Sequence, residues 1–383
     1  MNIQRPYLDN LEGERDYIPL VKPSITELEI KYVNDAVRNG WGSNRNNYID
    51  LFEKNFAKKI GSKYALATSS CTGALHLGLS ALGIKAGDEV IVPESTWVAT
   101  LAPILHLGAK PVFVDISSDD WCIDPHLVEK AITHKTKAIV LVHLYGNVCE
   151  IERLKEISLK FNVPIIEDSA EAFGSYFKSR HVGTNGIFGV FSFHGSKTIS
   201  TGEGGMFVTN NKELFENVKI LNNHGVNRTL SEQYCPELPG YKYKISNIQA
   251  AMGYAQLKRS KSLINSKKEI MEFYKDFFSY NPNITFNLEK KDVTNSYWMP
   301  TALFAKNSGI CIKNLINDFQ YNKIDARSFF WPLSSLKFCS PVLKNKVSRD
   351  IQSRSINLPS FFEISENQLI KICSILKKHL ELN

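Results

Sequence analysis

The chain has 383 residues, of which 43% are hydrophobic and 22% are charged, a composition typical of a globular protein with room for a large core. Its net charge of +7 is small for this length, and because basic and acidic residues are interleaved, the charge pattern argues against nucleic-acid binding. Apolar runs such as residues 138–142 are strand-sized, far below the roughly 20 residues of a membrane helix, so no membrane segment is expected.

The N-terminal stretch and the cysteines indicate the compartment. Residues 1–17 contain no apolar run behind Arg5, so no secretory signal is expected. The seven cysteines are scattered and form no C-x-x-C pair, which argues against a disulfide framework and against a zinc site. We therefore expect a cytoplasmic protein that binds no metal.

Short apolar runs alternate with helical stretches between residues 60 and 210, a pattern typical of an α/β fold. Most runs are continuously apolar, as expected for strands buried on both faces of a mainly parallel sheet with helices on both faces. Seven strands are predicted, at Lys63–Ser69, Glu89–Pro93, Pro111–Ile116, Lys137–Tyr145, Pro164–Asp168, Gly189–Phe193 and Gly205–Thr209.

The pattern changes at Asn247, where a long helix or a helix pair is predicted to extend to Tyr280. Short strands and two helical segments follow, and the last helix, Glu366–Leu382, carries its apolar residues largely on one face. We expect a large domain over residues 1–255 and a smaller C-terminal α+β domain over residues 256–383.

The segment Thr68–Leu82, TSSCTGALHLGLSAL, joins a strand directly to an apolar helix. Such a junction presents unpaired backbone N–H groups and the positive end of the helix dipole, which together hold a phosphate. Cys71, Thr72 and Gly73 are the candidate cradle. Ordinary capping of the helix by Ser70 or Thr72 explains the same residues equally well.

The segment Pro164–Gly174, PIIEDSAEAFG, carries two adjacent acids to the carboxyl end of a strand, where ligands of open α/β sheets bind. Strand alternation sends Glu167 and Asp168 to opposite faces, so at most one of them points into a given site. Metal binding, helix capping and a structural salt bridge remain alternatives for these acids.

The segment Phe191–Gly205, FSFHGSKTISTGEGG, carries Lys197 in a polar loop between two strands. A P-loop would require glycines at positions 191 and 196, which are Phe191 and Ser196, so GSKT is not a nucleotide-phosphate motif. A lysine in a desolvated loop at the sheet edge can lose its proton and attack a carbonyl. The alternative is an ordinary solvated lysine.

The three segments together supply what pyridoxal 5′-phosphate requires of a protein: N–H groups for the phosphate, an acid for the ring nitrogen and an amine for the aldehyde. Trp97 follows another strand end and is a candidate to stack on the ring, with a role in the core as the alternative.

Seven motifs along nearly the whole chain resemble the DegT/DnrJ/EryC1/StrS family of sugar aminotransferases. In chain order they are SSCTGAL, GDEVIVPESTWVAT, GAKPVFVDI, VHLYG, IIEDSAEAFGS, FSFHGSKTISTGEGGMFVTN and GYKYKISNIQAAMGYAQLKR. The resemblance implies an aspartate-aminotransferase-like fold (PLP fold type I) and a homodimer with shared active sites. It also implies transfer of an amino group from L-glutamate to a nucleotide-linked keto sugar.

The matched motifs also imply site residues. The resemblance places Lys197 at the Schiff-base position, Asp168 beside the pyridine nitrogen and Trp97 against the ring. The remaining implied cofactor contacts are Glu171 beside the phenolic oxygen, Ser192 with the backbone of Cys71 and Thr72 at the phosphate, and Asn247 reaching the phosphate of the neighbouring subunit.

Details of the motifs favour amination at C4. A related branch that dehydrates sugars at C3 has histidine where this chain has Lys197. SSCT, VHLYG and TGEGGM resemble perosamine-synthase and viosamine-type enzymes, which aminate C4 of a 4-keto-6-deoxyhexose for surface polysaccharides such as the O-antigen of lipopolysaccharide. A 3-aminotransferase and a non-catalytic regulatory member are the alternatives.

The substrate pocket is the least defined part of the resemblance. Pro332–Phe338 carries Ser334 and Ser335 where relatives often have a PLH-type histidine. This segment, together with Trp331 and His194, is expected to contact the substrate. GDP, dTDP and UDP sugars all remain open.

Overall fold

The computed structural model describes residues 16–227 and 235–381. Residues 1–15, where the sequence predicts no secretory signal, lie outside the described residues. The main element is a seven-stranded sheet with the strand order β1-β9-β8-β5-β4-β2-β3. Its strands are β1 (Tyr64–Thr68), β2 (Glu89–Pro93), β3 (Lys110–Val114), β4 (Thr136–Val142), β5 (Ile165–Asp168), β8 (Phe188–Ser192) and β9 (Gly205–Thr209).

The sheet is mainly parallel, as predicted. β2, β3, β4, β5 and β8 pair in parallel, whereas β9 is antiparallel to both of its neighbours, β1 and β8. The loop between β8 and β9 is therefore a hairpin connection, and it lies at the carboxyl end of the parallel strands. This loop carries Lys197.

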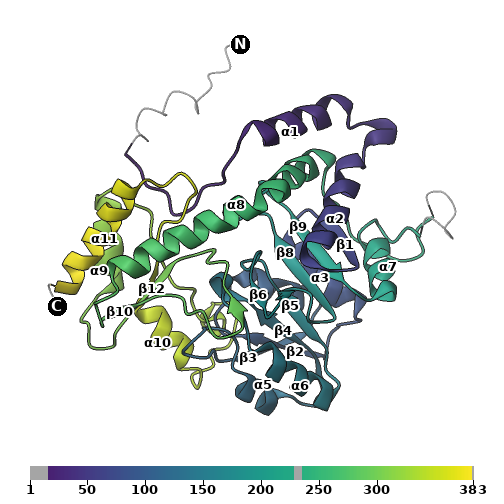
Figure 1. The fold of residues 1–383 in the computed structure, drawn as a ribbon. Helices are drawn as coiled ribbons and strands as arrows, with labels where there is room; N and C mark the ends of the chain where they lie inside the picture. The colour runs from purple at the N-terminus through teal and green to yellow at the C-terminus, as the bar shows by residue number, and fades with distance from the viewer. Residues whose placement is uncertain (1–15, 228–234, 382–383) are drawn as a thin grey trace, which may run out of the picture.

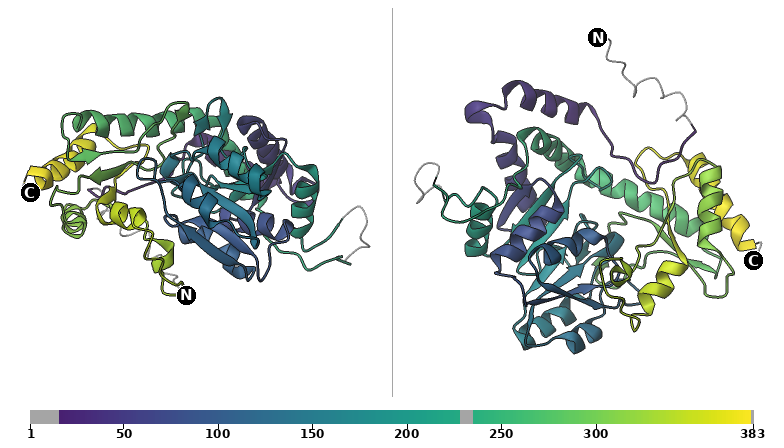
Figure 2. Two further views of the ribbon diagram at one scale, coloured as in Figure 1. Left: turned by 90° about the horizontal axis from the view of Figure 1, so that it is seen from below. Right: turned by 180° about the vertical axis from the view of Figure 1, so that it is seen from behind.

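Helices cover both faces of the sheet (Figure 2). One layer consists of α3 (Cys71–Ala81), α4 (Ala102–His106) and α7 (Lys212–Leu221). The other consists of α5 (Pro125–Ala131) and α6 (Ile151–Phe161) at one end, and of α2 (Asn47–Ile60) and the start of α8 (Asn247–Phe277) at the other. α1 (Glu27–Asn39) packs against α8.

The two helix layers explain why the strands of the sheet are continuously apolar. In β2, Val90 and Val92 pack with α3, while Ile91 packs with α5 and α6 on the opposite face. In β4, Val140 packs on the α3 side of the sheet and Ile139 packs on the side of α5 and α6. Because successive side chains of a strand point to opposite faces, a strand covered on both sides needs apolar residues at every position.

The helix α8 runs from beside β9 to a second, smaller sheet (Figure 1). That sheet has the order β10-β12-β14-β13 and packs with α8, α9 (Ile312–Tyr321) and α11 (Glu366–Glu381). Its strands are β10 (Ile284–Thr285), β12 (Thr301–Phe304), β13 (Arg327–Ser328) and β14 (Ser355–Asn357). The remaining elements are α10 (Val347–Ser353) and a three-stranded sheet of β6 (Tyr176–Phe177), β7 (Arg180–His181) and β11 (Val293–Thr294).

The predicted fold class and the seven predicted strands are confirmed, and the long helix at Asn247 is a single helix. The predicted strand boundaries agree to within two residues except at one end: β4 ends at Val142 and not at Tyr145. Tyr145 has a φ of 56°, in the left-handed region, so the chain turns sharply after β4. The division into two domains at residue 255 stays a prediction.

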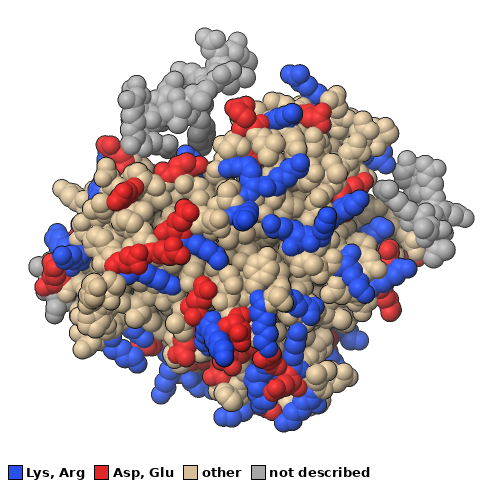
Figure 3. All heavy atoms as spheres, in the orientation of Figure 1, with Lys and Arg blue, Asp and Glu red and all other residues tan. Residues whose placement is uncertain are grey.

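The surface carries both signs of charge. In Figure 3, basic and acidic side chains are intermixed over α5 and α6, where Arg153 and Lys160 both pair with Glu129. No helix among the described residues is long and apolar enough to cross a membrane.

Candidate active site

Lys197 lies in a short, closed loop. The backbone bonds of Phe193 with Gly204 and with Thr201 hold the ends of the loop together. The side chain of Lys197 is only 14% exposed, and its Nζ donates to Oε1 of Glu171 at 3.1 Å. This ammonium is therefore held inside the cavity at the sheet edge and not in bulk solvent.

The first turn of α3 forms the opposite wall. Ser70 is the N-cap, and its Oγ accepts from the backbone N of Gly73 at 3.0 Å. Within the described part of the chain, the backbone N–H groups of Cys71 and Thr72 have no hydrogen-bond acceptor. Capping by Ser70 and an anion cradle at Cys71 and Thr72 are thus compatible, because they use different N–H groups.

Two features keep this helix end suited to an anion. Burial raises the pKa of the Cys71 thiol well above its usual value, and the charge of Asp168 raises it further, so the thiol is neutral. Gly205 opens β9 beside this turn, and a Cβ at Gly205 would lie 2.4 Å from the backbone N of Cys71. The close approach of β9 to the cradle therefore requires glycine at this position.

The two adjacent acids of β5 separate as strand alternation predicts. Oδ2 of Asp168 accepts from Oγ1 of Thr100 at 2.8 Å, and Oδ1 accepts from the backbone N of Ala170 at 3.1 Å. Burial raises the pKa of Asp168 above its usual value, although these bonds and the charge of Lys197 act in the other direction. Among the described residues, no basic side chain forms an ion pair with this buried carboxylate, so a cationic ligand would lower the cost of burying it.

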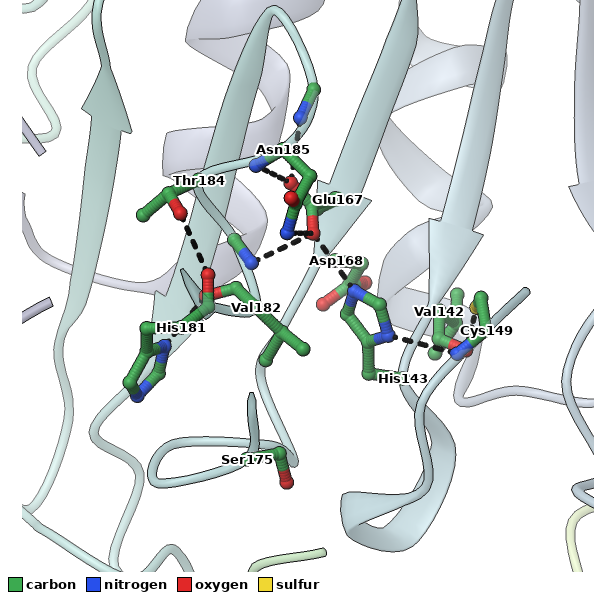
Figure 4. A network of polar contacts seen from close by, with 12 residues as sticks. Val142, His143, Cys149, Glu167, Asp168, Ser175, His181, Val182, Thr184 and Asn185 are labelled. Carbon is green, nitrogen blue, oxygen red and sulfur yellow. Dashed lines mark hydrogen bonds and ion pairs between the residues drawn. The ribbon is translucent and has the colours of Figure 1, made fainter. Parts of the chain in front are cut away.

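Glu167 belongs to a separate buried network (Figure 4). Its carboxylate accepts from the backbone N of Gly183 at 2.8 Å and of Gly186 at 2.7 Å, and from Nε2 of His143 at 3.0 Å. Burial alone would raise the pKa of Glu167, but His143 and the backbone N–H groups bring it below its usual value. Glu167 is thus satisfied within the fold and anchors the turn after β7.

His143 orients this network toward β5. The backbone N of Cys149 donates to Nδ1 of His143 at 3.3 Å, so Nε2 carries the proton that Glu167 accepts. The backbone N of His143 donates to the carbonyl of Asp168 at 3.1 Å. The network therefore fixes the strand end from which Asp168 projects.

Glu171 links the lysine loop to the turn after β4. Its Oε2 accepts from the backbone N of Tyr145 at 3.1 Å, and its Oε1 accepts from Lys197. Burial raises the pKa of Glu171, while Lys197 and the Tyr145 amide oppose that shift. This amide belongs to the left-handed turn that follows β4.

One cavity of about 380 Å³ brings most of the predicted residues together. Its lining includes Cys71, Thr72, Trp97, Asp168, Glu171, Ser192, His194 and Lys197. At its mouth His194 is half-exposed, with Nδ1 accepting from the backbone N of Ser196 at 3.2 Å and Nε2 3.7 Å from Glu203.

Asn247 and Trp331 lie outside this cavity, as do Ser334, Ser335 and Gly73, whose N–H donates to Ser70. Asn247 accepts from the backbone N of Tyr48 at 2.9 Å and donates to the carbonyl of Gly40 at 3.4 Å. Trp331 lines a second, largely aromatic cavity of about 630 Å³. The two cavities adjoin, because Trp97, Trp298, Arg327 and Phe330 line both.

Sequence reasoning missed Trp298, Arg327 and Thr100. Nζ of Lys197 lies 3.6 Å from the centroid of the Trp298 ring, and Arg327 projects into both cavities. Both come from the region of the small sheet, more than 100 residues after Lys197, and no local pattern marks them. Thr100 is three residues after Trp97, and its place on the same turn was the available signal.

The described residues fit pyridoxal phosphate. The 380 Å³ cavity is lined by an amine, by a buried carboxylate and by a helix N-terminus. In the part of the chain that the structure describes, the carboxylate has no cationic ion-pair partner and the first two N–H groups of the helix have no acceptor. These groups match the aldehyde, the ring nitrogen and the phosphate of this cofactor.

Comparisons with known proteins agree with this fit. Residues 23–377 match the DegT/DnrJ/EryC1/StrS aminotransferase family. The chain is 41% identical to GDP-perosamine synthase of Escherichia coli O157:H7, over 94% of this chain and 98% of that protein. It is 36% identical to GDP-perosamine synthase of Vibrio cholerae, over 94% of this chain and 99% of that protein. Spr1654 of Streptococcus pneumoniae in its PLP-form superposes with a TM-score of 0.87 at 30% identity, covering 96% of this chain and 99% of that chain. The chain therefore belongs to the DegT/DnrJ/EryC1/StrS aminotransferase family and uses pyridoxal phosphate as its cofactor.

Proposed function

We propose that this enzyme transfers the amino group of L-glutamate to the C4 ketone of a GDP-linked 4-keto-6-deoxyhexose. The observation that carries this proposal is the 41% identity, over nearly the full length of both chains, to a GDP-perosamine synthase, together with Lys197 in the cofactor cavity. With lysine at position 197, the chain also differs from the dehydrating branch of the family, which has histidine there.

Each residue of the cavity has a role in this proposal. Bound cofactor supplies the electron sink that makes proton removal from the amine-bearing carbon feasible. Nζ of Lys197 binds the aldehyde and, when released, moves that proton. Asp168 pairs with the protonated ring nitrogen, which offsets the cost of burying its carboxylate. Trp97 covers the ring.

The phosphate lies at the start of α3 in this proposal. The backbone N–H groups of Cys71 and Thr72 and the hydroxyl of Ser192 hold it there, while Glu171 neighbours the phenolic oxygen. Two observations support this assignment. These residues line the same cavity as Lys197, and the backbone N–H groups of Cys71 and Thr72 have no acceptor among the described residues.

The two substrates differ in what they require. L-Glutamate brings carboxylates, and Arg327 is the arginine that lines the cavity, with Asp325 3.1 Å away as its present partner. The acceptor brings a nucleotide, and the adjoining aromatic cavity with Trp331 offers surfaces on which a base can stack. His194, at the mouth of the first cavity, is placed to contact the sugar.

We also propose that two copies of the chain assemble with shared active sites. Asn247 lies outside the cavity of its own chain, as a residue that serves a neighbour's cofactor would. Ile30, Val37, Trp41 and Leu51 are exposed apolar side chains on α1, α2 and the turn between them, and a second copy would cover them. The cytoplasmic location stays a prediction.

A substrate panel tests the proposal. Enzyme, cofactor and L-glutamate are incubated with GDP-, dTDP- and UDP-linked 4-keto-6-deoxyhexoses, and products are identified by mass and NMR. An amine at C4 of the GDP sugar is expected. An amine at C3 would favour a 3-aminotransferase, and absence of product with every sugar, with cofactor bound, would favour a non-catalytic member.

A further inference from the structure

Trp298 is fixed beside the lysine loop by contacts on two sides. Its side chain lies just before β12, is 6% exposed and donates from Nε1 to the carbonyl of Ser196 at 2.8 Å. On its other side the indole lies 6.0 Å from the ring of Tyr145. The position of the ring is therefore set by the fold and does not depend on Lys197.

The ammonium of Lys197 lies between this ring and a carboxylate. Nζ is 3.6 Å from the indole centroid and 3.1 Å from Oε1 of Glu171. A tryptophan face attracts a cation within about 6 Å and does so more strongly than phenylalanine or tyrosine. The ring face and the carboxylate therefore contact Nζ from two sides.

Transamination requires Lys197 to be free for part of each cycle. When a substrate's amine would occupy the cofactor, Lys197 would have to stay close enough to accept a proton as the amine and to give it up again as the ammonium. A lysine side chain has a flexible four-carbon stem, so without a binding site its amine would sample many positions.

We propose that the Trp298 ring and Glu171 form a holding site for the ammonium that Lys197 becomes once its released amine has taken up a proton. Trp298 is in this view a positioning residue: it keeps Nζ in the cavity at the stage when the cofactor carries the substrate's amine. This inference rests on the proposed role of Lys197. It assigns a function to a residue from the small-sheet region, which reaches the lysine only in the folded chain.

A purely structural role for Trp298, acting through its bond to Ser196, makes different predictions. Fluorinated tryptophan introduced at position 298 keeps the shape of the ring and its N–H, but it weakens the attraction of the ring face for a cation. Trp298→Phe keeps a ring and loses the N–H, and Trp298→Leu loses both. The three replacements therefore separate the ring face from the hydrogen bond.

The first readout uses protein without cofactor, so it does not depend on catalysis. An amine-reactive reagent is added at fixed pH, and labelling of the peptide that contains Lys197 is followed by mass spectrometry, with peptides of exposed lysines as internal references. Because fluorination weakens the contact that holds Nζ against the ring, it should speed labelling of Lys197 by about 2- to 10-fold, the range that a cation–π contact supplies. Equal labelling of the fluorinated and unmodified proteins would overturn the holding site.

The second readout is a single turnover with L-glutamate in the loaded enzyme. Fluorinated tryptophan should slow the proton-transfer step by a similar factor and leave the KM for glutamate unchanged, with Trp298→Phe between wild type and Trp298→Leu. A fluorinated enzyme as fast as wild type, with Phe and Leu equally slow, would show that only the bond to Ser196 matters. An inactive wild type would overturn the proposed function, while the labelling result would still test the contact.

Discussion

Lys267 of α8 provides a stability prediction that can be worked out from the structure. Its side chain is 1% exposed, and Nζ donates to the carbonyl and, at 3.1 Å, to the hydroxyl of Ser360. No carboxylate among the described residues forms an ion pair with it. Burial lowers the pKa of Lys267 to about 7, so the folded protein holds this amine neutral at alkaline pH.

The sign of the pH dependence follows from linkage. An unfolded lysine has a pKa of about 10.4, so between about pH 7 and pH 10 the unfolded chain binds one more proton than the folded chain. The free energy of unfolding therefore rises with pH in that window, by about 1.4 kcal/mol per pH unit, or about 3 kcal/mol over two units. Below about pH 7 the lysine is protonated in both states, and this contribution is constant.

Replacement of Lys267 by Met keeps an unbranched side chain and removes the titrating group. Urea unfolding of wild type and Lys267→Met is followed by circular dichroism at several pH values, without cofactor and at one protein concentration, because ligands and assembly shift stability. The free energy of unfolding of wild type, minus that of Lys267→Met, should rise with pH at the slope given above. Lys268→Met on the same helix is the control and should parallel wild type. Parallel curves for Lys267→Met would refute the account of this buried amine.

Three further predictions concern the site. Gly205→Ala should weaken cofactor binding more than 10-fold in a spectroscopic titration, because the new Cβ meets the backbone of Cys71; affinity equal to wild type would contradict the tight cradle. Glu167→Gln should lose stability at neutral pH, and its unfolding energy should fall less steeply than that of wild type below about pH 4, since the lowered pKa of Glu167 gives stability that protonation removes. Asn247→Ala should retain cofactor poorly on dialysis. A mixed dimer of Asn247→Ala and Lys197→Ala subunits should keep one intact site, which combines Lys197 of the first subunit with Asn247 of the second. Mixed dimers without activity in any combination would argue against shared sites.

Much of the fold could be predicted because its signals are local. Strands such as β2 and β4 are covered on both faces, and this burial is recorded in the sequence as unbroken apolar runs. Asp168 ends β5, Cys71 and Lys197 come shortly after β1 and β8, and the topology of a parallel sheet brings strand ends to one edge. Their meeting in one cavity is a consequence of that topology.

The residues that were missed depend on contacts between distant segments. Trp298 and Arg327 reach the cavity from the small-sheet region, and nothing in their neighbouring residues indicates that approach. The apolar run that ends at Tyr145 predicts strand to its last residue, and nothing in it indicates a left-handed turn. In the fold, the Tyr145 amide donates to Glu171 and its buried hydroxyl accepts from Asn357, and both partners are distant in the sequence.

Transfer of isotopically labelled nitrogen tests the central claim most directly. Wild type and Lys197→Ala are each loaded with cofactor and incubated with labelled L-glutamate and a GDP-linked 4-keto-6-deoxyhexose, and the sugar product is examined by NMR. The account predicts label on C4 of the sugar with wild type and none with Lys197→Ala. Label on another carbon, or equal transfer by the two proteins, would contradict it.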